Sequence, residues 1–140
     1  MDTKRLVIGT IVGAVMMRLV GYLIFDVAAA GFYAADAVAG TFRDAYLEWA
    51  IALGNLSLAA LVTLGIESRA GAPTLTTGLM TGAVIGFLVW FGVDFILYGI
   101  TNVWGLASTI VDPFLSAINI GIAGAVVAAV LARIPKAAAA

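Results

Sequence analysis

One stretch of this sequence reads TGLMTGAVIGFLVWFGVDFIL and covers residues 77–97. Its only charged residue is Asp94, near its end, and a helix needs about 20 apolar residues to cross the hydrocarbon core of a bilayer. Polar or turn-rich segments separate this stretch from three others like it, so we predict four transmembrane helices. The other three are expected at about residues 6–25, 49–66 and 114–134.

The composition of the 140-residue chain also indicates a membrane protein. Hydrophobic residues make up 64% of it and charged residues 11%, with a mean hydropathy of +1.14. A soluble domain is about 45–50% apolar and about 25% charged. Because an open sheet cannot satisfy its backbone in lipid, we predict an all-α fold, a membrane four-helix bundle that forms a single domain over residues 1–140.

Two missing residue types exclude several functional classes. The chain has no Cys and no His, and its net charge is −1. Thiolate metal sites, cysteine nucleophiles and histidine general bases are therefore excluded, and nucleic-acid binding has no electrostatic basis. We expect no catalytic residue, no metal, no cofactor and no nucleic-acid partner.

Turn signals mark the expected helix ends. Residues 71–73, Gly-Ala-Pro, separate the second helix from the third. Asp112 followed by Pro113 is typical of an N-cap and a first helical position, so these residues are expected to open the last helix. Residues 27–48 are mixed in composition and are expected to form an extramembrane loop that could hold an interfacial helix near residues 32–38.

The distribution of basic residues predicts the orientation. Five basic residues flank the helices on the side of the chain ends, whereas the other side has only Arg43. The positive-inside rule then places both termini in the cytoplasm, in what we expect to be a bacterial inner membrane. The five residues are Lys4, Arg5, Arg69, Arg133 and Lys136.

Arg18 interrupts the first apolar stretch, and a charged residue at this depth is a functional candidate. At 1.5 Å per residue, Arg18, Asn55 and Asn119 lie about 9–10 Å below the same surface. We predict that Arg18 pairs with Asp94, with Asp112 and Glu48 as second choices. The cluster could be an ion pair that sets helix register, a pocket open to the periplasm, or an unpaired arginine reaching toward the headgroups. Its candidate members are Arg18, Tyr22, Glu48, Asn55, Asp94, Tyr98, Asn102, Asp112 and Asn119.

Glycines recur at four-residue spacing, which permits close approach of helices in lipid. They could pack within one bundle or against a second copy. Because Gly9 and Gly13 lie opposite Arg18 on a helix, an inward Arg18 would turn them outward. The predicted packing residues are Gly9, Gly13, Gly78, Gly82, Gly86, Gly121 and Gly124.

The second half of the chain carries a short motif. Tyr98-Gly99-Ile100-Thr101-Asn102 is followed by Leu106 and Asp112, after a glycine-rich helix. This pattern resembles a group of small bacterial four-helix membrane proteins of unknown function. That group usually has an acidic residue where this chain has Gly99. The resemblance implies a topology and no activity.

The sequence supports two functional hypotheses. The first is a non-catalytic integral membrane protein that packs through Gly/Ala faces as a homo-oligomer or as an accessory subunit of a larger membrane complex. The alternative is a small-ligand or ion binding or transport component that uses a polar layer open to the periplasmic side.

Overall fold

A computed structural model describes residues 2–41, 43–69 and 71–135, and this part of the chain is all-α with no strand. Four of its helical segments are long and apolar enough to cross a membrane. The prediction of a membrane four-helix bundle is therefore confirmed. The segments are α1 (Thr3–Gly21) continued by the π-helix η1 (Tyr22–Ala28), α3 (Glu48–Glu67), α4 (Leu75–Ile100) and α5 (Leu106–Leu131), with the short α2 (Ala30–Asp36) after η1.

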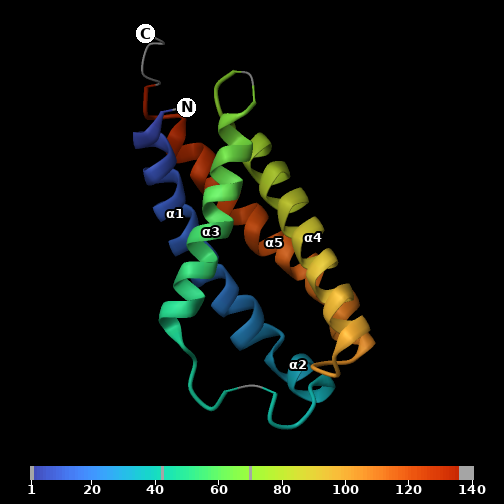
Figure 1. Cartoon of the computed structure of the whole chain (residues 1–140). Coiled ribbons are helices and arrows are strands. Elements are labelled where there is room, and N and C mark those ends of the chain that lie inside the picture. The colour runs from blue at the N-terminus through green and yellow to red at the C-terminus, as the bar shows by residue number, and fades with distance from the viewer. Residues whose placement is uncertain (1, 42, 70, 136–140) are drawn as a thin grey trace.

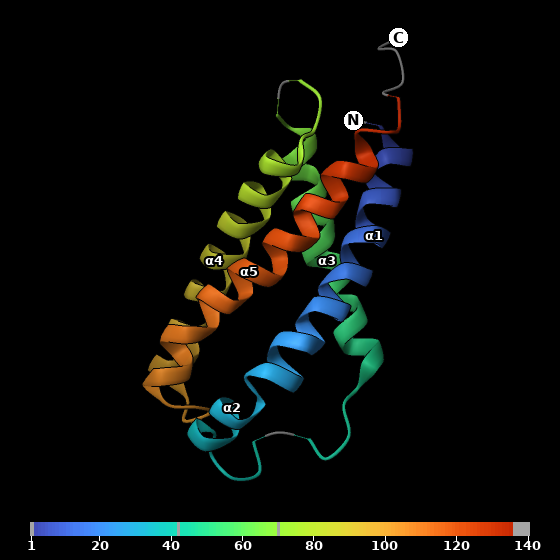
Figure 2. The same cartoon turned by 180° about the vertical axis from the view of Figure 1, so that it is seen from behind.

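The four long helices form two pairs that spread apart toward one end. α1 packs against both α3 and α5, whereas α4 packs almost entirely against α5. Figure 1 and Figure 2 show that α4 and α5 slope away from α3 toward the end that carries α2. The N-terminal residues, the end of α5 and the α3–α4 loop all lie at the opposite end (Figure 1).

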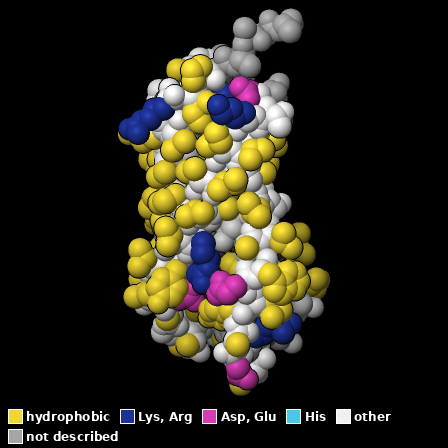
Figure 3. Space-filling model, turned by 90° about the vertical axis from the view of Figure 1, so that its left-hand side faces the viewer, with side chains coloured by type: hydrophobic (Ala, Val, Ile, Leu, Met, Phe, Trp, Pro, Cys, Tyr) yellow, Lys and Arg dark blue, Asp and Glu magenta, His cyan; other side chains and the backbone are white. Residues whose placement is uncertain are grey.

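The surface of the bundle has the polarity expected of a membrane protein. Large apolar side chains are exposed along α1, α3, α4 and α5. On the face shown in Figure 3, hydrophobic side chains cover the middle, while charged side chains gather near the upper end and below the middle. A hydrocarbon layer would solvate this apolar surface, since lipid replaces water around it.

Glycines bring α4 and α5 into backbone contact. A Cβ added at Gly86 would lie 2.8 Å from the carbonyl oxygen of Ser116, and one at Gly121 would lie 3.3 Å from the Cβ of Ala83. At Gly78 and Gly82 it would meet the α5 backbone itself. The missing side chains therefore allow the two helices to approach more closely than larger residues would permit.

The glycines of α1 also face the bundle interior. A Cβ at Gly9 would lie 2.5 Å from Cγ2 of Thr63, and one at Gly13 would lie 2.9 Å from the Cβ of Ala59. The suggestion that this face points outward is wrong, because it assumed an inward Arg18. The helix is rotated so that its small residues pack against α3, and Arg18 lines the groove between α1 and α3.

The last helix begins earlier than predicted. α5 starts at Leu106, and Pro113 lies inside it rather than at its first position. The N-cap is Gly105, and the amide of Ser108 donates a hydrogen bond of 2.9 Å to Oδ2 of Asp36. A carboxylate from α2 therefore accepts the hydrogen bond at the start of α5 that was expected to be accepted by Asp112. The assignment of Asp112 as the helix cap is wrong.

The other boundaries agree with the predictions to within a few residues. α3 matches the expected 49–66, and α4 extends the expected 77–97 at both ends. The first helix begins earlier and continues through η1, so it covers the start of the expected loop at 27–48. Within that loop, α2 supplies the short helix expected near 32–38. Lys136, used in the orientation argument, lies outside the described residues.

Candidate functional site

The spread of the two helix pairs leaves a cavity of about 590 Å³ at the α2 end of the bundle. Side chains from α1, η1, α2, α3, α4 and α5 line it, together with residues of two connecting loops. Its wall combines aromatic rings with carboxyl, hydroxyl and amide groups. Its polar and aromatic lining includes Arg18, Tyr22, Phe25, Asp26, Tyr33, Tyr46, Asn55, Trp90, Trp104, Asp112, Ser116 and Asn119.

The carboxylate of Asp112 is the central acidic group of the cavity. The hydroxyl of Tyr33 donates a hydrogen bond of 2.7 Å to Oδ1, and the hydroxyl of Ser116 donates one of 3.2 Å to Oδ2. Burial, followed by the hydrogen bond and the charges of the nearby aspartates, raises the pKa of Tyr33 far above its usual value. Tyr33 therefore remains a hydrogen-bond donor to Asp112 at physiological pH.

Asp94, on α4, does not line the cavity. It is completely buried, with 0% exposure. Neither of its oxygens accepts a hydrogen bond from a donor among the described residues. Asp94 was predicted to belong to the polar cluster, whereas it is buried and does not line the cavity.

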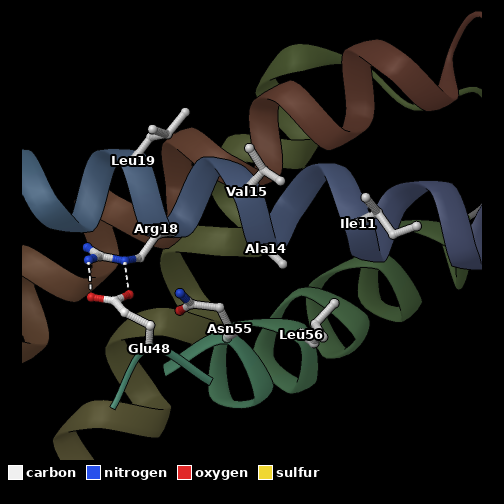
Figure 4. A pocket seen from close by; sticks show the side chains of 9 residues that line it. Ile11, Ala14, Val15, Arg18, Leu19, Glu48, Asn55 and Leu56 are labelled. Atoms are coloured by element: carbon white, nitrogen blue, oxygen red, sulfur yellow. Dashed lines mark hydrogen bonds and ion pairs between the residues drawn. The ribbon is translucent and has the colours of Figure 1, made fainter. Parts of the chain in front are cut away.

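Arg18 pairs with Glu48, which was a second choice, and not with Asp94. Its Nη2 lies 3.0 Å from Oε1 of Glu48, and its Nη1 lies 3.8 Å from Oδ2 of Asp26. Figure 4 shows the double contact between Arg18 and Glu48, with Asn55 beside it. The predicted Arg18–Asp94 pair is wrong because the inward glycine face turns Arg18 toward the start of α3.

This ion pair lies where the cavity meets a second hollow. A groove of about 440 Å³ runs along the seam between α1 and α3, and Arg18 and Asn55 line both it and the cavity (Figure 4). The Arg18 guanidinium also lies 5.8 Å from the ring centre of Tyr22. The exposed fractions of the Arg18 and Glu48 side chains are 36% and 61%, so the pair is at the surface of the bundle.

Asn119 presents an amide to the cavity from α5. The residue is 9% exposed, and its Oδ1 has no hydrogen-bond partner among the described residues. A buried polar atom without a partner is costly, about 1–3 kcal/mol in protein mutational data. Such an atom in a cavity wall is available to a ligand or a water molecule.

Two of the predicted residues lie away from this site. Tyr98 is 44% exposed near the end of α4, and Asn102 is exposed in the loop after it. Neither lines the cavity. Their place in the sequence motif therefore does not bring them to the polar cluster.

Several lining residues were missed by the sequence analysis. Tyr33, Trp90 and Trp104 reach the cavity from three different parts of the chain. Asp26 follows Arg18 by two turns, and its place in η1 turns it to the same cavity as Phe25. A π-helical segment is frequent at functional sites, but no pattern in the sequence predicted one here.

A buried ionic cluster occurs at the opposite end of the bundle. Arg5 is 1% exposed, and its Nη2 lies 2.7 Å from Oε1 of Glu67. Its Nη1 donates hydrogen bonds to the carbonyl oxygens of Leu131, at 2.7 Å, and Ile134. The sequence indicated a role for Arg5 only in the orientation of the chain, whereas the structure shows that it joins α1, α3 and the end of α5.

Comparison with protein-family models, curated proteins and solved structures finds no match to this chain. The resemblance suggested by residues 98–102 and Asp112 therefore stands only in its coarse form, as four membrane-spanning helices. Among the described residues, no group of three or more acidic side chains is arranged to hold a metal ion.

Proposed function

We propose that this multi-pass membrane protein binds a small amphipathic molecule in the cavity between its two helix pairs. The cavity's combination of apolar walls and inward polar groups carries the proposal. Ligand sites typically have volumes of about 300–1,000 Å³, with mostly apolar walls and a few convergent polar groups. The volume of about 590 Å³ and the presence of Asp112 and Asn119 in the wall fit that description.

The cost of the polar groups supports a binding role. Asp112 and Asn119 lie on a membrane-spanning helix, and polar residues in such segments are expensive and usually functional. A bundle that served only as a scaffold would be more stable with apolar residues at these positions, because buried charged groups rarely add net stability. Ligand binding gives a reason for keeping them.

We further infer that the cavity faces the periplasm of a bacterial inner membrane. The described basic residues Lys4, Arg5, Arg69 and Arg133 lie at the end opposite α2, whereas Arg43 lies in the loop after α2. The positive-inside rule favours the cytoplasm for the basic end. The cavity, next to α2, would then be reached from outside.

The alternative of a homo-oligomer or complex subunit that packs through Gly/Ala faces ranks second. The seven predicted packing glycines each have neighbours from another helix of the same bundle within 4 Å of an added Cβ. An oligomer would have to use other surfaces, such as the exposed apolar side chains of α4. A partner is therefore compatible with the fold but is not favoured by the glycines.

Single-cysteine labelling tests the binding proposal, because the chain has no cysteine of its own. We expect Asn119→Cys to react with a membrane-impermeant thiol reagent added from the α2 side. Ala123→Cys, one turn further along α5 at a position with 0% exposure, is the matched control and should stay unreactive. Failure of Asn119→Cys to react from that side would contradict a water-accessible cavity.

A further inference from the structure

The groove between α1 and α3 begins at the Arg18–Glu48 ion pair and continues between apolar side chains. Figure 4 shows this pair and Asn55 at one end of the groove, with Ile11 and Leu56 toward the other end. The groove is open along the surface of the bundle, since Ile11 and Leu56 in its walls are 54% and 38% exposed. A hollow that is charged at one end and apolar along its length fits an amphipathic molecule.

The groove also has the direction and length of a lipid chain. Glu48 is the first residue of α3, so the ion pair lies at the end of this span that faces the α2 side of the bundle (Figure 1). From Arg18 to Ile11 along α1, and over a similar stretch of α3, the rise is about 10–12 Å at about 1.5 Å per residue. One leaflet contributes about half of a hydrocarbon core of about 30 Å. The apolar part of the groove therefore runs from the edge of one leaflet most of the way to the bilayer centre.

The polar end of the groove has one guanidinium group and two carboxylates. Nε and Nη2 of Arg18 donate hydrogen bonds to the carboxylate of Glu48. Nη1 lies 3.8 Å from Oδ2 of Asp26, which is beyond hydrogen-bonding distance, and it donates no hydrogen bond to any described residue. The group therefore has a guanidinium donor left for a further acceptor, and one carboxylate charge that Arg18 does not balance.

The charges of lipid headgroups can be compared with this arrangement. A headgroup with a phosphate alone offers an acceptor to Arg18 but brings a further negative charge toward Asp26 and Glu48. A headgroup with an ammonium group alone balances a carboxylate but leaves Nη1 of Arg18 without an acceptor. A headgroup that has both groups satisfies the guanidinium and the carboxylates together, because charge-assisted hydrogen bonds then form in both directions.

We propose that the α1–α3 groove holds an aminophospholipid from the bilayer leaflet at the α2 end of the protein. The phosphate accepts hydrogen bonds from Nη1 of Arg18, the ammonium group donates to the carboxylates of Asp26 and Glu48, and one acyl chain lies along the groove. The lipid enters sideways from the bilayer through the open face of the groove. The inference goes beyond the proposed function, because the groove is separate from the cavity and shares only its polar end with it.

The test is competitive lipid binding to the purified full-length protein in mild detergent, measured by native mass spectrometry. An equimolar mixture contains three lipids with the same oleoyl chains: phosphatidylethanolamine, phosphatidylglycerol, which has a phosphate but no ammonium group, and dioleoyl trimethylammonium propane, which has an ammonium group but no phosphate. We expect phosphatidylethanolamine to be bound at least about tenfold more than either of the others, as one additional charge-assisted hydrogen bond predicts. Because the lipids compete in one sample, their ratio does not depend on how much of the protein is folded.

Two variants separate the headgroup contacts. Arg18→Gln removes the donor to the phosphate, so the preference over dioleoyl trimethylammonium propane should be lost while the preference over phosphatidylglycerol remains. Glu48→Gln removes a carboxylate that faces the ammonium group, so it should reduce the preference over phosphatidylglycerol and leave the other preference in place. The same change of both ratios in the two variants would contradict the assigned contacts.

A third variant tests the place of the acyl chain. Ala52 is exposed and lines the groove, so Ala52→Phe should fill the groove and lower the amount of bound phosphatidylethanolamine several-fold. Ala50→Phe, at an exposed position two residues earlier on α3 and outside both hollows, is the matched control and should bind as the unmodified protein does. Glycerophosphoethanolamine, which has the same headgroup without acyl chains, should not displace the lipid at equal concentration.

The outcomes distinguish this inference from the proposed function. Equal binding of the three lipids, or displacement of the lipid by glycerophosphoethanolamine at equal concentration, would overturn the inference. If no lipid is preferred but Asn119→Cys is labelled, the inference fails and the proposed function stands. If phosphatidylethanolamine is preferred but Asn119→Cys stays unreactive, the lipid site stands and binding in the cavity fails. If no lipid is preferred and Asn119→Cys stays unreactive, both proposals fail.

Discussion

The hydroxyl of Tyr33 donates a hydrogen bond of 2.7 Å to Oδ1 of Asp112, although 79 residues separate the two in the chain. The bond connects α2, which lies outside the predicted spans, to the interior of α5. Tyr33 thereby holds α2 across the cavity end of the bundle. This contact helps to position a wall of the site and supplies a donor to the carboxylate of Asp112.

Replacing Tyr33 with Phe should therefore destabilise the protein. The change removes a hydrogen bond to a charged group, and such bonds contribute about 1.5–3 kcal/mol. Unfolding by titration with a denaturing detergent, followed by circular dichroism, measures the loss. Tyr98→Phe is the matched control, because Tyr98 is 44% exposed, and an equal effect of both substitutions would contradict the assigned role.

The Arg5–Glu67 pair should contribute more strongly than the Arg18–Glu48 pair. The Arg5 and Glu67 side chains are 2% and 6% exposed, and removing one partner of a buried pair typically costs about 3–5 kcal/mol. Arg5→Met should cause a loss of this size in the same unfolding assay.

The double variant Arg5→Met/Glu67→Met checks this interpretation. It should recover part of the loss, because no buried charge then remains without its partner. Lys4→Met, at an exposed position on the same turn, controls for the loss of a positive charge at this end of the bundle. Purely additive losses at Arg5 and Glu67 would show that the two groups are not coupled.

The close approach of α4 and α5 predicts opposite effects at two glycines of the same helix. A Cβ at Gly82 would lie 3.1 Å from Cα of Gly121 and still closer to the carbonyl of Ile120, whereas one at Gly92 would have no neighbour within 4 Å. Gly82→Ala should destabilise the bundle by about 1–3 kcal/mol, as overpacking does.

Gly92→Ala is the matched partner of that experiment. It should be neutral or stabilise the helix by up to about 1 kcal/mol, because alanine has the higher helix propensity. Both variants are compared by detergent unfolding at the same protein concentration. Equal tolerance of alanine at Gly82 and Gly92 would mean that the helices are not in backbone contact at Gly82.

Asp36 should make the docking of α2 onto α5 sensitive to acid. Hydrogen bonding from Ser108, and also from the amide of Gly105, holds the pKa of Asp36 below its usual 3.8. The carboxyl group of Asp36 therefore takes up a proton at a higher pH when the segment is unfolded than when α2 is docked. The stability that Asp36 adds to the docked state is complete above pH 3.8 and is lost as the pH falls through the lowered pKa.

Amide hydrogen exchange at Ser108 across an acid titration measures this loss. Asp36→Asn keeps a side-chain acceptor for the helix start but has no carboxyl group to protonate. Exchange at Ser108 in this variant should therefore show no step caused by protonation at position 36. Asp36→Ala should increase exchange at all pH values. Identical acid profiles of the unmodified protein and Asp36→Asn would rule out Asp36 as the titrating group.

Part of the site could be predicted because depth along a helix is a local property. Counting residues from the expected helix ends placed Arg18, Asn55 and Asn119 in one layer, and all three line the cavity. Rotation about the helix axis is not a local property. It depends on which face packs, and the contacts of Gly9 with Thr63 and of Gly13 with Ala59 turned Arg18 toward Glu48 instead of Asp94.

The number of spans, their approximate limits and the all-α class follow from the sequence alone, since hydrophobic length and backbone satisfaction in lipid require nothing from the rest of the chain. The start of α5 does not, because its capping acceptor is Asp36, 72 residues before the amide that it binds. Nor does the hydrogen bond from Tyr33 to Asp112, which joins residues 79 positions apart. Only the docking of α2 against α5 brings those two side chains together, because contacts between distant residues depend on the three-dimensional arrangement of the helices.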